Sequence, residues 1–305
     1  MRIIITGAGG FVGREICSQL LRRGDQVTGL DINTDGMLPG VIKVEGALSD
    51  AAARADFLDA DFDALIHLAT VPGGAAEADP SASRRVNVDA MYDLLLEAAG
   101  RKPGVRVVYA SSIAVLGDTL PAKVDDQTPL SPKMIYAGHK AMMEDVVAMM
   151  SNRSAIDGVT VRLPGILARP KGPSGMKSAF MSDLFHALKK GEAFECPVSP
   201  DGTIWAQSVK KCAENFIHAI ALDSALLPPT RAVTLPAIRI SMEHLAAEIG
   251  EQCSFPPSLV SYNPDLALEA AFARQPLLET PAAERAGFAH DGNPATLVGN
   301  ALSAI

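Results

Sequence analysis

Cysteine and histidine, the residues that most often staple a fold or bind a metal, are scarce in this chain. The four cysteines (Cys17, Cys196, Cys212 and Cys253) are scattered over 305 residues and form no Cys-x-x-Cys pair. Neither a disulfide framework nor a zinc site is therefore predicted. None of the six histidines has the spacing of a metal ligand, and we expect no bound metal.

Basic residues are also few. The chain has 27 Lys and Arg against 35 Asp and Glu, which gives a formal net charge of −8. Nucleic acids and anionic membrane surfaces both attract clustered Lys and Arg, so we expect neither as a partner. No charge-free apolar run reaches the roughly 18 residues of a membrane helix, and the first residues are typical of a strand rather than of a signal peptide. A cytoplasmic protein with small-molecule partners is expected.

The first half of the chain contains apolar strands that alternate with amphipathic helices. Strands are expected at Arg2–Thr6, Gln26–Asp31, Ala64–Ala69, Arg106–Ser111 and Val159–Pro164, and helices from Val12 onward, at Arg84–Ala99 and at Ile135–Met150. Near-continuous apolar strands separated by helices are typical of a parallel sheet that is buried on both faces. The pattern predicts an α/β fold with a doubly wound, Rossmann-like parallel sheet.

A glycine-rich turn joins the first strand to the first helix. Gly7, Gly10 and Gly13 are spaced as Gly-x-x-Gly-x-x-Gly. A pyrophosphate needs a tight turn, a close approach of the backbone, and the free N–H groups at a helix N-terminus. Because the motif lies between a strand and a helix, we interpret it as a dinucleotide-binding turn rather than as three structural glycines.

Asp31 stands at the end of the second predicted strand, 18 residues after Gly13. A carboxylate at that place can accept hydrogen bonds from the adenosine ribose, and it would repel a 2′-phosphate. The next residues, Ile32, Asn33 and Thr34, include no arginine that could bind such a phosphate. The sequence therefore favours NAD over NADP.

The composition changes after Pro164, where proline and glycine gather at 169–175 and Pro-Pro pairs recur at 228–229 and 256–257. We predict that residues 1–165 form an NAD-binding domain, rejoined by about 203–222. Residues 166–202 and 223–305 are expected to form a smaller, C-terminal substrate-binding lobe.

Tyr136 and Lys140 begin a predicted helix at a spacing of four residues, which places both side chains on one face. A free tyrosine has a pKa of about 10 and is a poor base near neutrality. A nearby ammonium group stabilises the phenolate and lowers that pKa. Ser112, at the end of the preceding strand, could donate a hydrogen bond to a reacting oxygen, although a strand-end cap would also explain it.

Taken together, these residues resemble the extended short-chain dehydrogenase/reductase family. The matching segments are Thr6–Gly13, Asp31, His67–Ala69, Asn87-Val88, Ser111–Gly117, Tyr136-x-x-x-Lys140 and Arg162–Pro164. The resemblance implies a catalytic triad of Ser112, Tyr136 and Lys140. It also implies cofactor contacts, with Leu48 near the adenine and the backbone around Pro164 near the nicotinamide. The other implied cofactor contacts are Gly7, Gly10, Phe11, Val12, Gly13, Asp31, Leu68, Ala69, Asn87, Tyr136 and Lys140.

Within this family the chain is similar to the dehydrogenases of small sugar acids. The segments that carry this similarity are Ser111–Val115, Val161–Pro164, Arg169-Pro170, Ser178–Phe180, Pro197–Asp201 and Trp205. It implies NAD-dependent oxidation of a secondary alcohol of an aldonate to the 2-keto acid, with Tyr136 as general base. The chain departs from the family pattern at Ala47, Gly73, Leu116 and His139, and the changes at Gly73 and His139 bear on the substrate.

Two other functions stay open. A sugar or nucleotide-sugar epimerase would use the same cofactor in a transient hydride transfer, but Pro164 stands where such epimerases commonly have an asparagine. A non-catalytic NAD-sensing protein would have little reason to keep Ser112, Tyr136 and Lys140 together. Dehydration is disfavoured, because Ile113 and Ala114 replace the Asp-Glu pair that follows the catalytic Ser or Thr of dehydratases.

A sugar-acid carboxylate needs a cation or several hydrogen-bond donors. Arg169 and Lys177 follow the last strand of the first half, where a segment can fold over the site, whereas core packing is the alternative for Trp205. The candidate substrate contacts are Thr70, Gly73, Ser112, Arg169, Ser174, Lys177 and Trp205.

The predicted helix that carries Tyr136 is apolar on nearly all sides, which exceeds what packing on one sheet requires. Met142, Val146 and Met149 contribute to this excess, and the helix at Val86–Ala99 offers a second apolar face. Two such helices and their copies would form a four-helix interface, as the family resemblance also implies. We expect a homodimer, with deeper burial inside one subunit as the alternative.

Overall fold

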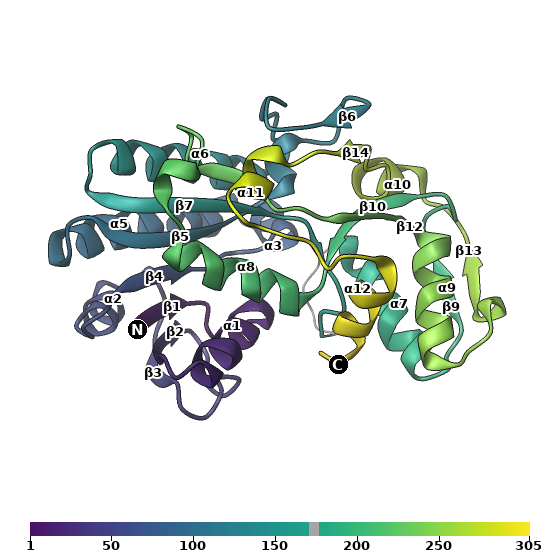
Figure 1. The fold of residues 1–305 in the computed structure, drawn as a ribbon, viewed down its shortest axis with the longest axis horizontal. Coiled ribbons are helices and arrows are strands. Elements are labelled where there is room, and N and C mark those ends of the chain that lie inside the picture. The colour runs from purple at the N-terminus through teal and green to yellow at the C-terminus, as the bar shows by residue number, and fades with distance from the viewer. Residues whose placement is uncertain (171–176) are drawn as a thin grey trace.

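Seven parallel strands form the central sheet of the computed structural model, which describes residues 1–170 and 177–305. Their order is β11-β7-β5-β4-β1-β2-β3 (Figure 1). The strands are β1 (Arg2–Thr6), β2 (Gln26–Asp31), β3 (Ile42–Glu45), β4 (Ala64–His67), β5 (Val105–Ser112), β7 (Ile156–Leu163) and β11 (Ala232–Thr234). The order reverses between β1 and β4, and open α/β sheets bind ligands at the carboxyl ends of the strands at such a point. The predicted doubly wound fold is confirmed.

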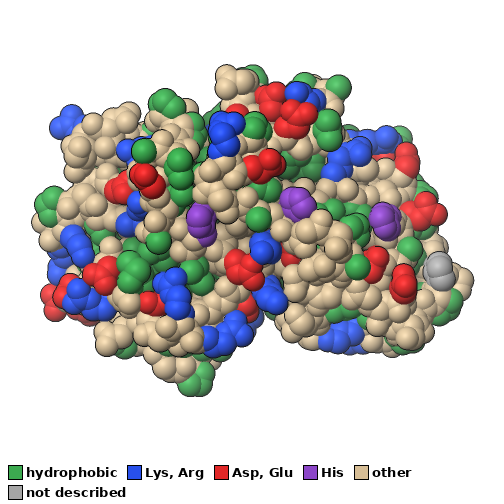
Figure 2. Space-filling view, in the orientation of Figure 1, with side chains coloured by type: hydrophobic (Ala, Val, Ile, Leu, Met, Phe, Trp, Pro, Cys, Tyr) green, Lys and Arg blue, Asp and Glu red, His purple; other side chains and the backbone are tan. Residues whose placement is uncertain are grey.

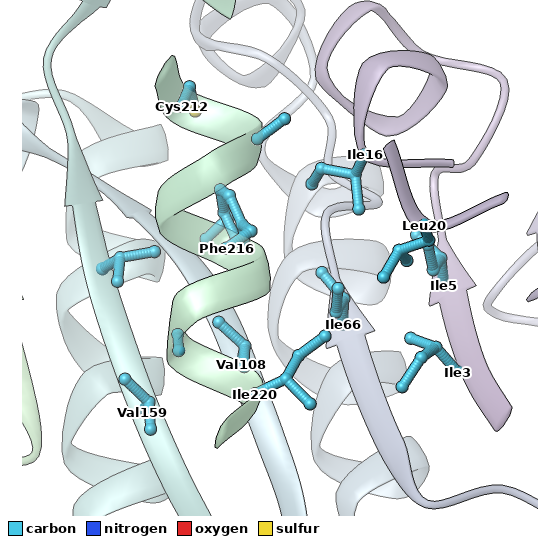
Figure 3. Packing of buried hydrophobic residues seen from close by; sticks show 14 of the residues in the cluster. Ile3, Ile5, Ile16, Leu20, Ile66, Val108, Val159, Cys212, Phe216 and Ile220 are labelled. Carbon is cyan, nitrogen blue, oxygen red and sulfur yellow. The ribbon is translucent and has the colours of Figure 1, made fainter. Parts of the chain in front are cut away.

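Helices cover both faces of this sheet (Figure 1). One face is covered by α1 (Phe11–Arg22) and α8 (Val209–Ala221), and the other by α2 (Ala51–Leu58), α5 (Met91–Arg101) and α6 (Ile135–Asn152). Successive side chains of a strand point to opposite faces, so Ile3 and Ile5 pack with α1 and α8, whereas Ile4 packs on the other side. Figure 3 shows Ile16 of α1 and Phe216 of α8 against this first face.

A smaller lobe with its own apolar core lies beside the large sheet (Figure 1). Its three-stranded sheet has the order β12-β10-β8. The strands are β8 (Gly165–Ile166), β10 (Thr203–Gln207) and β12 (Ile238–Ser241), and the helices that pack around them are α7 (Phe180–Lys189), α9 (Met242–Cys253) and α12 (Pro294–Leu302). The segment 203–222, predicted to rejoin the NAD-binding domain, is shared between the two parts: its helix α8 covers the large sheet, and its strand β10 belongs to the small sheet. The seventh strand of the large sheet, β11, lies beyond this segment.

Short elements connect these layers. They are α3 (Gly73–Ala78), α4 (Pro80–Arg84), the π-helix η1 (Arg85–Ala90), η2 (Ile113–Leu116), β6 (Lys123–Val124), η3 (Lys177–Ala179), β9 (Phe194–Cys196), η4 (Ser224–Leu226), η5 (Pro257–Leu259), β13 (Val260–Tyr262), α10 (Leu266–Phe272), β14 (Leu277–Leu278) and α11 (Pro281–Arg285). Acidic and basic side chains lie intermixed on the face shown in Figure 2. Among the helices of the described residues, none is long and apolar enough to cross a membrane.

Trp205 of β10 lies in a buried apolar cluster. Its side chain is 1% exposed and packs with Val115, Leu116 and Val124. Its indole N–H donates a hydrogen bond to the backbone carbonyl of Pro276 at 2.8 Å. A ring with so little exposed surface favours the core-packing alternative, and a contact of Trp205 with a substrate stays a prediction.

The buried indole makes a prediction about stability. Trp205→Phe should lower the free energy of unfolding by about 2 kcal/mol, because the Pro276 carbonyl loses its donor and the smaller ring leaves a void. Urea unfolding followed by circular dichroism measures this loss. Leu266→Ala is the control, since Leu266 is 77% exposed and should tolerate truncation. A Phe variant as stable as the parent would contradict the assignment of Trp205 to the core.

Candidate active site

The glycine-rich turn at the end of β1 has the geometry of a phosphate cradle. Gly7 has a φ of +74°, and a Cβ atom at Gly13 would lie 2.2 Å from the Gly7 carbonyl oxygen, so a side chain fits at neither position. Helix α1 follows from Phe11 after Gly10, and no described side chain caps its first N–H groups. These free donors and the positive end of the helix dipole suit a pyrophosphate. The turn therefore fits a dinucleotide cofactor.

Asp31 closes one side of this turn. Its Oδ2 accepts a hydrogen bond from the N–H of Gly9 at 2.9 Å, which places the carboxylate beside the phosphate cradle and only partly buried. It is thus available to hydroxyl groups of a ribose and hostile to a phosphate there. Leu48 is buried in the core cluster that includes Leu30, the residue before Asp31. Its contact with an adenine stays a prediction.

The loop after β4 lies directly against the cradle. A Cβ atom on Gly7 would come within 2.8 Å of the backbone nitrogen of Ala69, and Thr6 Oγ1 accepts hydrogen bonds from the N–H groups of Leu68 and Ala69 at 3.3 Å. The loop and the turn thus meet at the point where the strand order reverses. This is the place where a dinucleotide crosses the sheet edge in such folds.

Asn87 holds this loop from the π-helix η1. Its Oδ1 accepts hydrogen bonds from the N–H of Val71 at 2.7 Å and from the hydroxyl of Thr70 at 3.1 Å, and its Nδ2 donates to the Val71 carbonyl at 3.0 Å. The Asn87 side chain is 3% exposed. Its amide is therefore committed to the loop, and the effect of Asn87 on a cofactor would act through the loop.

Tyr136 and Lys140 lie one turn apart on α6, as their spacing predicts. The Lys140 ammonium donates a hydrogen bond to the Ala110 carbonyl at 2.7 Å. It lies 4.9 Å from the ring centroid of Tyr109 and 5.5 Å from that of Tyr136. Burial lowers the pKa of Lys140 to about 7, and the charge of Glu144 opposes this shift.

Ser112, Tyr136 and Arg169 come together at the carboxyl end of β5. Burial raises the pKa of Tyr136 to about 12, while the positive charge of Arg169 and a hydrogen bond with the Ser112 hydroxyl both act to lower it. Arg169 follows Ala168, which has a left-handed φ of +58°, and His186 Nε2 lies 2.7 Å from the Arg169 carbonyl oxygen. These two features fix the backbone at Arg169, whose charge acts on the phenol.

Glu144, which is not among the predicted site residues, lies on the same face of α6 as Tyr136 and Lys140. Its carboxylate makes three hydrogen bonds with the guanidinium of Arg162, at 2.7 to 3.1 Å, and accepts another from the Ser111 hydroxyl. A glutamate four residues after Lys140 in an apolar helix was the available signal. It pairs with an arginine at the end of β7, which the sequence did not indicate.

The remaining predicted site residues lie at four separate places along the chain. Phe11 and Val12 begin α1 beside the cradle, and Pro164 lies buried between β7 and β8. Gly73 opens α3, where a Cβ atom would lie 2.9 Å from Met134 Cε, just before α6. Ser174 and the side chain of Lys177 lie outside the described part of the chain.

Comparison with known proteins places this site in context. A model of the NAD dependent epimerase/dehydratase family matches residues 3–209. The chain is 35% identical to D-erythronate dehydrogenase of Cupriavidus necator over 79% of its own length and 78% of the relative's. It is 30% identical to D-erythronate dehydrogenase of Haemophilus influenzae, over 82% and 81% respectively. Among solved structures, a nucleoside-diphosphate-sugar epimerase from Agrobacterium tumefaciens matches with a TM-score of 0.86 and 26% identity, over 98% of this chain and 92% of that one.

The carboxylate at the end of β2 makes a prediction about cofactor choice. Asp31→Asn should raise the dissociation constant for NAD about tenfold and reduce the preference for NAD over NADP, because a charge-assisted acceptor is lost and a repulsive charge is removed. Calorimetric titration with each dinucleotide measures both effects. Asp35→Asn, an exposed neighbour in the same loop, should change neither. An unchanged ratio of the two constants would show that Asp31 does not select the cofactor.

Proposed function

The chain belongs to the NAD dependent epimerase/dehydratase family, and we propose that it oxidises a secondary alcohol of a small sugar acid, of the D-erythronate type, to the 2-keto acid. The relatives that are 35% and 30% identical are dehydrogenases, and the chain is accordingly an NAD-dependent dehydrogenase. The observation that carries the proposed substrate class is the partly buried cation of Arg169, whose charge acts on the Tyr136 phenol and lowers its pKa. A cation next to a proton-transfer group suits an alcohol whose neighbouring carbon is a carboxylate.

In this proposal Tyr136 accepts the proton of the substrate hydroxyl. NAD, if held by the glycine-rich turn of Gly7 and Gly13, would supply the acceptor for the hydride of the carbinol carbon. With a pKa of about 12, the phenol must be made more acidic before it can act as a base near neutrality. Positive charge nearby favours the phenolate. The value of about 12 already includes the charge of Arg169, so a further positive charge, such as that of an oxidised nicotinamide, would have to lower the pKa more. Lys140 adds positive charge while protonated.

The Ser112 hydroxyl would hold the reacting oxygen in line with Tyr136. Ser112 ends β5 and already hydrogen-bonds with the phenol. Its Oγ also accepts the N–H of Ala114 at 3.2 Å, which fixes its position at the strand end. A fixed donor at the place where charge changes on the substrate oxygen lowers the barrier to proton transfer.

Arg169 would bind the substrate carboxylate. Its guanidinium is partly buried next to Tyr136, where charge-assisted hydrogen bonds to a carboxylate are stronger than in water. Because the same guanidinium lies beside the proton-accepting phenol, the carboxylate it binds would belong to the carbon adjacent to the reacting carbinol. This arrangement supports a 2-hydroxy acid substrate and a 2-keto acid product.

A substrate screen tests the function. We expect NADH to form from NAD with one or more four- to six-carbon sugar acids and not with the polyol of the same carbon skeleton, which lacks the carboxylate. Tyr136→Phe should lower kcat by about a thousandfold, because it removes the general base. Absorbance of NADH is the measurement.

Tyr262→Phe, which changes a tyrosine of the small lobe, is the matched control and should leave kcat unchanged. Conversion of nucleotide sugars without net formation of NADH would favour the epimerase alternative, which the similarity to the Agrobacterium tumefaciens structure keeps in view. Equal turnover of acids and polyols would remove the role assigned to Arg169.

We also propose that the chain forms a homodimer through α5 and α6. Four large apolar side chains of these two helices are exposed: Tyr92 (37%), Leu96 (50%), Met142 (53%) and Met149 (40%). Between the helices lies a hollow whose lining combines apolar side chains with three carboxylates: Val88, Tyr92, Met142, Met143 and Val146, with Asp89, Asp93 and Asp145. Two adjacent apolar helices on one surface suit a second copy of the same pair, because a four-helix contact buries both.

Charge placed on this surface should separate the subunits. Met142→Lys is expected to reduce the mass in solution from that of two chains to that of one, because an ammonium would be buried in an apolar contact. Light scattering after gel filtration measures the mass. Leu266→Lys introduces the same charge at a site that is 77% exposed on the small lobe and should leave the mass unchanged. A monomeric parent would rule out the dimer.

A further inference from the structure

We propose that His139 is a positioning residue for NAD, acting through Ser83 and Asn87 on the loop that follows β4. The inference rests on the use of NAD by this family and not on the identity of the substrate. His139 precedes Lys140 on α6, and its partners are on α4 and η1. These elements bring a titratable ring into contact with the hydrogen-bond network that holds residues 68–71, the loop after β4, which we call the cofactor loop.

The connection consists of three consecutive hydrogen-bonding steps. His139 Nδ1 lies 2.9 Å from Ser83 Oγ. Asn87 Nδ2 donates to the same Ser83 Oγ at 3.1 Å. Asn87 in turn binds Thr70 and Val71 with both its amide oxygen and its amide nitrogen. A change at the imidazole therefore reaches a loop that touches Gly7 of the phosphate cradle through Ala69.

The Ser83 hydroxyl has a single proton to donate, and His139 Nδ1 is the described acceptor within reach of it. Ser83 already accepts a hydrogen bond from Asn87 and is 0% exposed. Its proton can go to His139 Nδ1 only when that nitrogen is an acceptor, which requires a neutral imidazole. No other described residue receives a hydrogen bond from this hydroxyl.

Protonation of His139 would turn Nδ1 into a donor. Ser83 Oγ would then face two donors, and its own buried proton would lose its acceptor. An unsatisfied buried group is costly, so the network would rearrange at the hydrogen bond from Asn87 Nδ2 to Ser83 Oγ. The loop of Thr70 and Val71 would follow, because it depends on the Asn87 amide.

The surroundings of His139 set the range of pH in which this occurs. Burial is the largest influence and lowers its pKa below the usual 6.5; Arg84 of α4 acts in the same direction. Asp89 of η1 and Glu77 of α3 raise it, less strongly in sum. Since the pKa is lowered, the neutral form that completes the network prevails at pH 7 and above. Affinity for the dinucleotide should be full there and fall as the pH drops through the pKa.

The local backbone supports a positioning role. Asn87 lies in a six-residue π-helix between α4 and α5, and such widened turns occur often at functional sites. Glu77 also accepts a hydrogen bond from the N–H of Ile135 at 2.7 Å, which ties α3 to the start of α6. His139 thus lies where the helix of Tyr136 meets the segment that follows the cofactor loop.

Fluorescence titration with NADH, without any substrate, tests the inference over the range of about pH 5 to 8 in which histidine titrates. For the unmodified protein we expect the dissociation constant to rise several-fold toward low pH. His139→Asn keeps a polar group near the position of Nδ1 but does not titrate, so it should bind NADH well with a flat pH profile. His139→Leu should weaken binding several-fold at every pH.

Ser83→Ala should reproduce the weak binding and the flat pH profile of His139→Leu. The double variant His139→Leu/Ser83→Ala should bind NADH no more weakly than either single variant, because both substitutions break the same series of hydrogen bonds. Ser81→Ala, an exposed hydroxyl on the same short helix, is the matched control. A pH profile that persists in His139→Asn, or parental affinity in Ser83→Ala, would overturn the inference.

The two proposals fail in different ways. If the protein binds NADH with the expected pH profile but oxidises no sugar acid, the proposed substrate is wrong and the role of His139 stands. If sugar acids are oxidised while NADH affinity is the same at all pH values and in every variant, the role of His139 is wrong and the function stands.

Discussion

The burial of the Lys140 ammonium against the carboxyl end of β5 is the interaction on which the rest of the site depends. An amine removed from water loses its charge easily, and burial brings the pKa of Lys140 down to about 7. Two features counteract this loss: the hydrogen bond to the Ala110 carbonyl and the charge of Glu144 one turn further on. The ammonium therefore fixes the position of α6 relative to β5, and that position places Tyr136 beside Ser112.

Glu144 extends this constraint into the sheet. Its carboxylate is 3% exposed, and the Arg162 guanidinium compensates its burial through paired hydrogen bonds. Because Arg162 is on β7 and Ser111 is on β5, one carboxylate joins α6 to two neighbouring strands. A phenol, a cation and an anion thus follow one another along one helical face, at intervals of four residues, from the carboxyl end of β5 into the core.

The sequence indicated those parts of the molecule that depend on neighbours along the chain. The bounds of β1 and β2 agree with the prediction, as does the first residue of α6, because continuous apolar runs and a helical period define them. β3 was missed because it is an edge strand whose four residues are mostly exposed, and β11 because it has only three. The bonds of Ser83 with His139 and of Glu144 with Arg162 join different elements, and no spacing along the chain encodes them. Trp205 is a second example, since the sequence alone does not distinguish a tryptophan in a pocket wall from one packed in a core.

Helix α6 is apolar on more sides than packing on a sheet requires, and the structure supplies the reason. Residues 136, 140 and 144 repeat every four positions and point toward the strands, whereas Met142 and Met149 are seven apart, two full turns, and face outward. His139 falls between these two rows and meets α4. In the functions proposed above, one helix therefore carries proton transfer on its inner row, association on its outer row and cofactor positioning between them. A helix with these three roles leaves little of its surface to solvent, which explains why apolar residues lie on nearly all of its sides.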